Sequence, residues 1–124
     1  MKSLFEKLTE LLGDDLLFGQ MPDSPHDLII ANIYAGNSPT YAIDEMLPMI
    51  REVGVQLMAR GLDYIECVTK LDSHMNTLQS YYGDLDDTYY VMSVSQTSDI
   101  LPLGRDKQNR YLFSINMTVK LHRR

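Results

Sequence analysis

The stretch Y-L-F-S-I-N-M-T-V-K-L at residues 111–121 decides the fold. Its odd-numbered positions are all apolar, and its even-numbered positions are polar except at Leu112. Successive side chains of a β-strand point to opposite faces, so this period of two predicts a strand with one buried and one polar face. A slip of one residue would bury the polar set, so the register is well specified. The chain must therefore build a sheet, and its other segments must supply partner strands and a cover.

Further strands are expected where β-branched and aromatic residues gather, at 15–18, 28–34, 49–60 and 88–96. The segment 49–60 is ambiguous because Gly54 in its interior weakens either structure, but its alternating apolar residues favour a strand. The connection 97–110 is long for a hairpin, and its residues G-R-D-K-Q-N suit the tip.

The first helix is expected at residues 3–12, where four leucines fall on one stripe. Ser3 and Glu6 have the spacing of a capping box, in which each side chain bonds a free backbone N–H of the first turn. Gly13 is placed to end the helix in a left-handed conformation.

The second helix is expected at residues 63–80, with Asp63 as its N-terminal cap. Its buried stripe is predicted to comprise Ile65, Val68, Leu71, Met75 and Leu78. The element order is therefore α-β-β-β-α-β-β. Because the strands come in adjacent pairs, we predict an α+β fold, a largely antiparallel sheet with two helices packed on one face.

The length and the ordinary apolar content predict a single domain spanning residues 1–124. No apolar run approaches the roughly 18 residues that a membrane span needs, and the charged N-terminal segment is unlike a secretion signal.

Charge is unevenly placed. Residues 1–104 hold 5 Lys and Arg against 16 Asp and Glu, whereas residues 105–124 hold 6 Lys and Arg and one Asp. An acidic body with a basic end indicates either nucleic-acid contact or contact between subunits, and the acidic body favours the second.

Residues that can carry chemistry are scattered. The histidines at 26, 74 and 122 lack metal-ligand spacing, and the lone Cys67 can form neither an intrachain disulfide nor a cysteine zinc site. Asp84, Asp86 and Asp87 lack the glycine and glutamate positions of a calcium loop and read as a solvated turn. We therefore expect no enzyme, no cofactor and no metal site.

The turn Gly104-Arg105-Asp106 has two interpretations. It is either a surface turn in which glycine supplies a positive φ and aspartate caps the backbone, or a charged loop tip that docks on a partner. If its charges are exposed, replacing Asp106 or Arg110 should impair assembly more than folding.

The block P-L-G-R-D-K-Q-N-R-Y-L-F-S-I-N-M-T-V-K-L at 102–121 resembles the C-terminal end of bacteriophage minor capsid or tail terminator proteins. The resemblance is carried by Gly104, Arg105, Asp106, Arg110, Ser114 and Asn116. A strand that ends in an arginine, here Arg60, and a helix such as 63–80 also fit the family, whereas 35–48 matches nothing. The candidate assembly interface comprises Arg60, Arg105, Asp106, Lys107, Arg110, Ser114 and Asn116.

The resemblance implies a structural role without catalysis. Such proteins of long-tailed phages form rings, typically hexameric, that cap the tail tube, halt its polymerisation and offer the surface that joins the head. The implied partners are further copies of the chain, the tube protein, a head-completion or connector protein, and phage DNA that passes through the lumen without sequence-specific binding. The implied location is the head–tail junction of the virion, after assembly in the host cytoplasm, with no membrane contact.

Two alternatives remain open at this point. One is another connector or the tube subunit itself, which would polymerise into filaments. The other is a nucleic-acid-binding regulator that uses the basic residues of the C-terminal segment: Arg105, Lys107, Arg110, Lys120, Arg123 and Arg124. Its affinity would fall steeply with salt.

Overall fold

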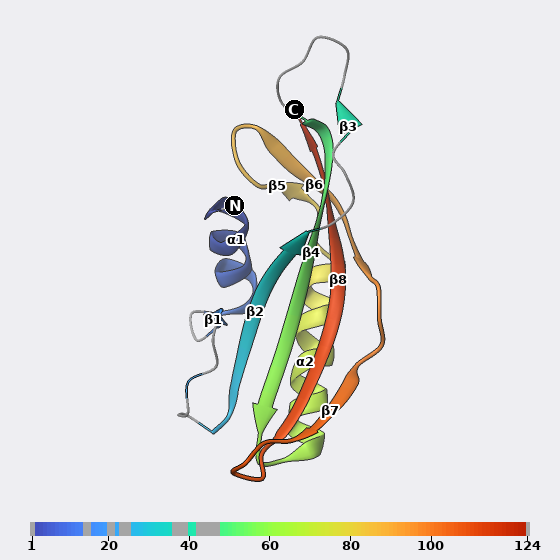
Figure 1. Cartoon of the computed structure of the whole chain (residues 1–124). Helices are drawn as coiled ribbons and strands as arrows, with labels where there is room; N and C mark the ends of the chain where they lie inside the picture. The colour runs from blue at the N-terminus through green and yellow to red at the C-terminus, as the bar shows by residue number, and fades with distance from the viewer. Residues whose placement is uncertain are drawn as a thin grey trace.

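The computed structural model describes residues 2–13, 16–19, 22, 26–35, 40–41 and 48–123. The long strand β8 (Tyr111–Arg123) lies at the centre of the sheet, between β4 (Pro48–Gly61) on one edge and β6 (Tyr89–Gln96) with β7 (Leu101–Arg105) on the other (Figure 1). The ladder between β4 and β8 runs from Ile50 opposite His122 to Gly61 opposite Tyr111. The predicted strand at 111–121 is confirmed and extends two residues further.

The sheet order is β1-β2-β4-β8-β6-β5, with β3 paired to β4 and β7 paired to β8. The short strand β1 (Leu17–Phe18) pairs parallel with β2 (Leu28–Ala35), and the other described pairs are antiparallel. The ambiguous segment 49–60 is a strand, as the alternation predicted. The sequence pattern did not reveal the short strands β3 (Thr40–Tyr41), β5 (Gly83–Asp84) and β7.

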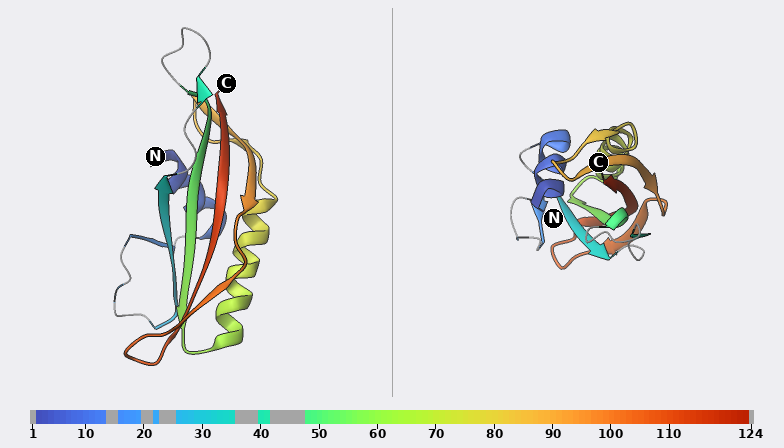
Figure 2. Two further views of the ribbon diagram at one scale, coloured as in Figure 1. Left: turned by 45° about the vertical axis from the view of Figure 1, so that its right-hand side comes forward. Right: turned by 90° about the horizontal axis from the view of Figure 1, so that it is seen from above.

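Both helices, α1 (Lys2–Leu12) and α2 (Tyr64–Gln79), cover the same face of the sheet (Figure 2). The core between the layers combines leucines of α1, the inner side of α2 and the odd-numbered side chains of the central strands. On β8 the buried odd-numbered residues are Phe113, Ile115, Met117, Val119 and Leu121. The predicted fold class and order of the elements are therefore confirmed.

The ends of the helices test the capping predictions. Asp63 caps α2 by accepting hydrogen bonds from the backbone N–H groups of Ile65 and Glu66, as predicted. Gly13 has φ 109° and closes α1 through a bond from its N–H to the carbonyl of Thr9. The predicted capping box is wrong, because α1 already includes Lys2 and the Ser3 hydroxyl donates to Asp86 at 2.8 Å.

The buried stripe of α2 is also shifted from the prediction. It consists of Cys67, Leu71, Met75 and Leu78. Ile65 is instead 74% exposed, because a helix turns by about 100° per residue and position 65 lies well away from this stripe.

Candidate functional site

The hairpin tip between β7 and β8 is held by the side chain of Asp106. Its carboxylate accepts hydrogen bonds from the backbone N–H groups of Gln108 and Arg110, each at 3.0 Å, and from the Arg110 Nε at 2.7 Å. These donors, the Arg110 N–H foremost, hold the pKa of Asp106 below its usual value. Asn109 completes the turn in the left-handed region at φ 64°. Under either interpretation of the turn, hydrogen bonds within the loop fix its shape.

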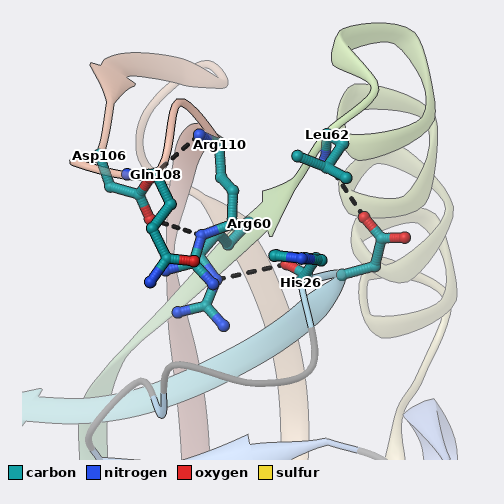
Figure 3. A network of polar contacts seen from close by, with 7 residues as sticks. His26, Arg60, Leu62, Asp106, Gln108 and Arg110 are labelled. Carbon is teal, nitrogen blue, oxygen red and sulfur yellow. Dashed lines mark hydrogen bonds and ion pairs between the residues drawn. The ribbon is translucent and has the colours of Figure 1, made fainter.

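Arg110 lies inside the subunit rather than on its surface. It is 3% exposed, and Arg60, which projects from β4 on the same face of the sheet, is 4% exposed (Figure 3). The Nε of Arg60 donates to the carbonyl of His26 at 3.3 Å. The sequence-based expectation that the turn charges are exposed is therefore wrong for Arg110. Its guanidinium group instead binds Asp106, four residues earlier in the same tip, at 2.7 Å.

Arg105 and Lys107 are the exposed basic residues of the tip. The Arg105 guanidinium lies 4.3 Å from the centre of the Tyr111 ring, and it donates to Asn109 Oδ1 at 3.1 Å and to the Tyr111 hydroxyl. These contacts orient Arg105 along the hairpin. Lys107 stands at the turn itself, so the tip presents one oriented and one projecting positive charge.

The remaining predicted residues lie further along β8. Ser114 is buried and faces Met58 across the ladder, and Asn116 is half-buried beside Gln56. The backbone of Asn116 bridges the break between β6 and β7, because its carbonyl accepts from the N–H of Thr97 and its N–H donates to the Ser98 hydroxyl. Five of the seven candidates, Arg60, Arg105, Asp106, Lys107 and Arg110, thus gather at one end of the sheet.

The basic C-terminal segment does not form one patch in space. β8 has 13 residues, and at about 3.3 Å per residue it separates its two ends by roughly 40 Å. Arg105 and Lys107 precede its first residue, whereas Lys120 and Arg123 lie at its far end (Figure 1). A charge split that looks like a basic tail in the sequence becomes two separate basic regions in the fold.

Sequence reasoning missed a group of exposed apolar side chains at the hairpin end of the molecule. They are Leu62, Tyr64, Ile65, Leu101 and Leu103. The register places the adjoining ends of β4, β7 and β8 at one level, because Arg105 of β7 pairs with Tyr111 of β8, which in turn pairs with Gly61 at the end of β4. Exposure of the strand residues could not be read from the sequence, since β7 itself was not predicted.

A shallow hollow of about 570 Å³, wide open to solvent and called the groove below, runs along the outward side of α2 from its first turn. It is lined by Asp63, Ile65, Glu66, Thr69, Lys70 and Ser73. A second cavity, beside Cys67, has a volume of only about 10 Å³, room for a single water molecule and no larger ligand. Burial raises the pKa of the Cys67 thiol, which makes it a poor nucleophile.

The part of the chain that the structure describes gives no support for a metal site or a membrane-spanning helix. Within those residues, no three His, Cys, Asp or Glu side chains come close enough to hold a metal ion. The Asp86 carboxylate is engaged by the N–H groups of Thr88 and Tyr89, each at 2.8 Å, as expected for a structural turn. Neither α1 nor α2 is long and apolar enough to cross a membrane.

Comparison with known proteins identifies the family of the chain. A search of curated proteins finds no matching relative. The model of the family described as bacteriophage tail terminator protein matches residues 9–123, which include both sides of the hairpin, the groove and the sheet. The chain therefore belongs to the bacteriophage tail terminator family, whose members are structural proteins of the phage tail.

Proposed function

We propose that this chain forms a ring, most simply a hexamer, that caps the finished tail tube, stops its polymerisation and provides the surface to which the head is joined. The observation that carries the proposal is the family match over residues 9–123. The proposed setting is the head–tail junction of the virion, reached after assembly in the host cytoplasm. The proposed partners are other copies of the chain, the tube protein and a head-completion or connector protein.

The geometry supports a role in assembly. Head-to-tail rings need two different surfaces on one subunit. The subunit has a rigid charged hairpin tip on one side and an open groove with exposed apolar residues on the other. Action through shape and charge requires no cofactor, and we propose none.

The separation of the basic residues favours assembly over gene regulation. Arg105 and Lys107 lie about one strand length from Lys120 and Arg123, so they do not form one continuous phosphate-binding stripe. We propose that DNA passes through the ring lumen without sequence-specific binding. Binding of the purified chain to short duplexes at low salt should therefore be weak and independent of sequence.

The direct test is tube growth with and without this chain. Purified tube protein of the same phage is polymerised alone, with the chain added at the start, or with the chain added after growth is complete. Electron micrographs should show shorter tubes when the chain is present from the start. Whether the chain is added before or after growth, one end of each tube should carry a ring. Unchanged tube lengths with no terminal ring would refute the proposal, and filaments of the chain alone would identify a tube subunit instead.

A further inference from the structure

The corner between β4 and α2 exposes apolar side chains on a rigid base. Leu62, Tyr64 and Ile65 are 56%, 50% and 74% exposed. The Tyr64 ring is fixed from beneath by edge-on contacts with Tyr111 and Phe113, at centroid distances of 5.4 and 4.8 Å. Exposed apolar groups held in fixed positions beside an open groove are typical of a surface that another protein covers.

The groove beside this corner is acidic at the end that lies over the first turn of α2. Asp63 and Glu66 line it together with Ile65, and both carboxylate residues are exposed. The positive charge among the lining residues, Lys70, lies one turn further along the helix than Glu66. A partner that fits must therefore bring a positive charge and an apolar side chain to the first turn of α2.

The hairpin tip of the same chain has this chemistry. Lys107 is exposed at the turn, and Leu103 is exposed in the strand that leads to it. The Asp106 hydrogen bonds fix the shape of the tip before binding, which lowers the entropic cost of docking. The charges of the tip and of the groove are complementary.

The tip and the groove lie on opposite sides of the subunit but at the same level. In Figure 2 the hairpin tip bends away from α2, to the other side of the sheet. The groove begins two residues after Gly61, and the tip ends directly before Tyr111, the partner of Gly61 in the ladder. Copies related by rotation about an axis along the strands would therefore bring the tip of one against the groove of the next.

We propose that the ring contact is the insertion of the hairpin tip of one subunit into the α2 groove of its neighbour, with Lys107 against Asp63 and Glu66, and Leu103 against Ile65. This inference rests on the proposed ring. It makes each contact heterologous, so that every subunit uses both surfaces, and the contacts close into a ring when the rotation between neighbours divides a full turn evenly. A second copy of this chain is the occupant, rather than the tube protein or DNA.

Charge reversal in the full-length chain tests the contact. Lys107→Glu places a negative tip against the acidic groove, and Glu66→Lys places a positive groove against the basic tip. Each variant alone should raise the protein concentration needed for half assembly by about tenfold or more, because like charges then meet across the contact. Mixing the two variants should restore rings with equal numbers of each, since every contact in an alternating ring is again complementary. Native mass spectrometry reads the ratio directly.

Two substitutions of exposed apolar residues test whether the effect on assembly is specific to this surface. Ile65→Asp should abolish assembly, whereas Tyr82→Asp, at a side chain that is 80% exposed elsewhere, should leave it unchanged. Circular dichroism should show that both variants remain folded, because neither side chain is in the core.

The outcomes distinguish this inference from the proposed function. If Lys107→Glu, Glu66→Lys and Ile65→Asp each still form rings like those of the wild type, the proposed contact is overturned. The proposed ring then still stands. Variants that form normal rings but no longer cap tubes would assign the groove to the tube protein and also overturn it. A wild-type chain that forms no ring, alone or on tubes, would overturn both proposals together.

Discussion

The two faces of β8 differ in burial, although their residues alternate along one strand. The odd-numbered face is buried against the helices and includes Ile115 and Met117. The even-numbered face carries the half-buried Asn116 and Thr118, and no described helix lies over it. The first face packs against the helices in the core, and Tyr111 at its start holds Arg105 of the hairpin tip. One strand can thus present one buried face and one more exposed face because successive side chains point to opposite sides of the sheet.

The largest effect is expected from a charge placed on the buried face. Ile115→Asp should cost at least about 4 kcal/mol and unfold the protein, because Ile115 is 1% exposed and the carboxylate would have no partner there. Asn116→Asp, one residue away on the other face, should change the free energy of unfolding by less than about 1 kcal/mol. Urea denaturation compares the two, and equal losses would show that the faces do not differ.

A cavity on the same buried face should have the next largest effect. Leu121 is fully buried, so Leu121→Ala should lower the free energy of unfolding by about 2–5 kcal/mol. Thr118→Ala on the other face should stay within about 0.5 kcal/mol. Thermal melts of both variants give this comparison, and a larger loss at Thr118 would place a hidden contact on that face.

The hairpin tip should show a smaller effect that depends on pH. Asp106→Asn removes the charge that binds Arg110, so it should lower the melting temperature at pH 7, by less than Leu121→Ala does. The pKa of Asp106 is lowered in the folded protein, so its stabilising contribution is present above about pH 4 and is lost as the pH falls through the folded-state pKa. The gap between wild type and variant should therefore narrow from pH 7 to pH 3. A gap that stays constant would mean that the charge of Asp106 is irrelevant.

The smallest effect is expected at Gly54, where the ring of Tyr34 lies against the backbone of β4. A methyl group at this position would overlap the ring, which is 43% exposed and can swing outward. Gly54→Ala should destabilise by about 1 kcal/mol or less in wild type, and stabilise by about 0.5–1 kcal/mol when Tyr34 is already alanine. A double-mutant cycle measures this change of sign, and additive effects would contradict the contact.

The sequence predicted the features that depend on periodicity and capping. The alternation at 111–121 located β8, the alternation at 53–59 identified β4 despite Gly54, and Asp63 marked the start of α2. It could not predict features that depend on contacts between distant residues. The burial of Arg60 and Arg110, and the exposure of Ile65, follow from how β4, β8 and α2 pack together. Only β7, which pairs with β8 on its outer edge, reveals that the tip is a tight hairpin rather than a long loop.

The same limits apply to the functional residues. The resemblance at 102–121 predicted a site at the hairpin, and the structure shows that Asp106 and Arg110 shape the tip while Lys107 is exposed on it. The groove at the start of α2 had no motif that would reveal it, because Ile65, its apolar lining residue, has the spacing of an ordinary buried stripe.

The mass of the wild-type chain in solution tests the central claim most directly. Light scattering and native mass spectrometry over a range of concentrations should reveal one closed species whose mass is a fixed multiple of 14.2 kDa, seen as rings in electron micrographs. A chain that stays monomeric at every concentration and on tail tubes, or that grows into filaments of increasing length, would contradict the account of this protein as a ring-forming tail terminator.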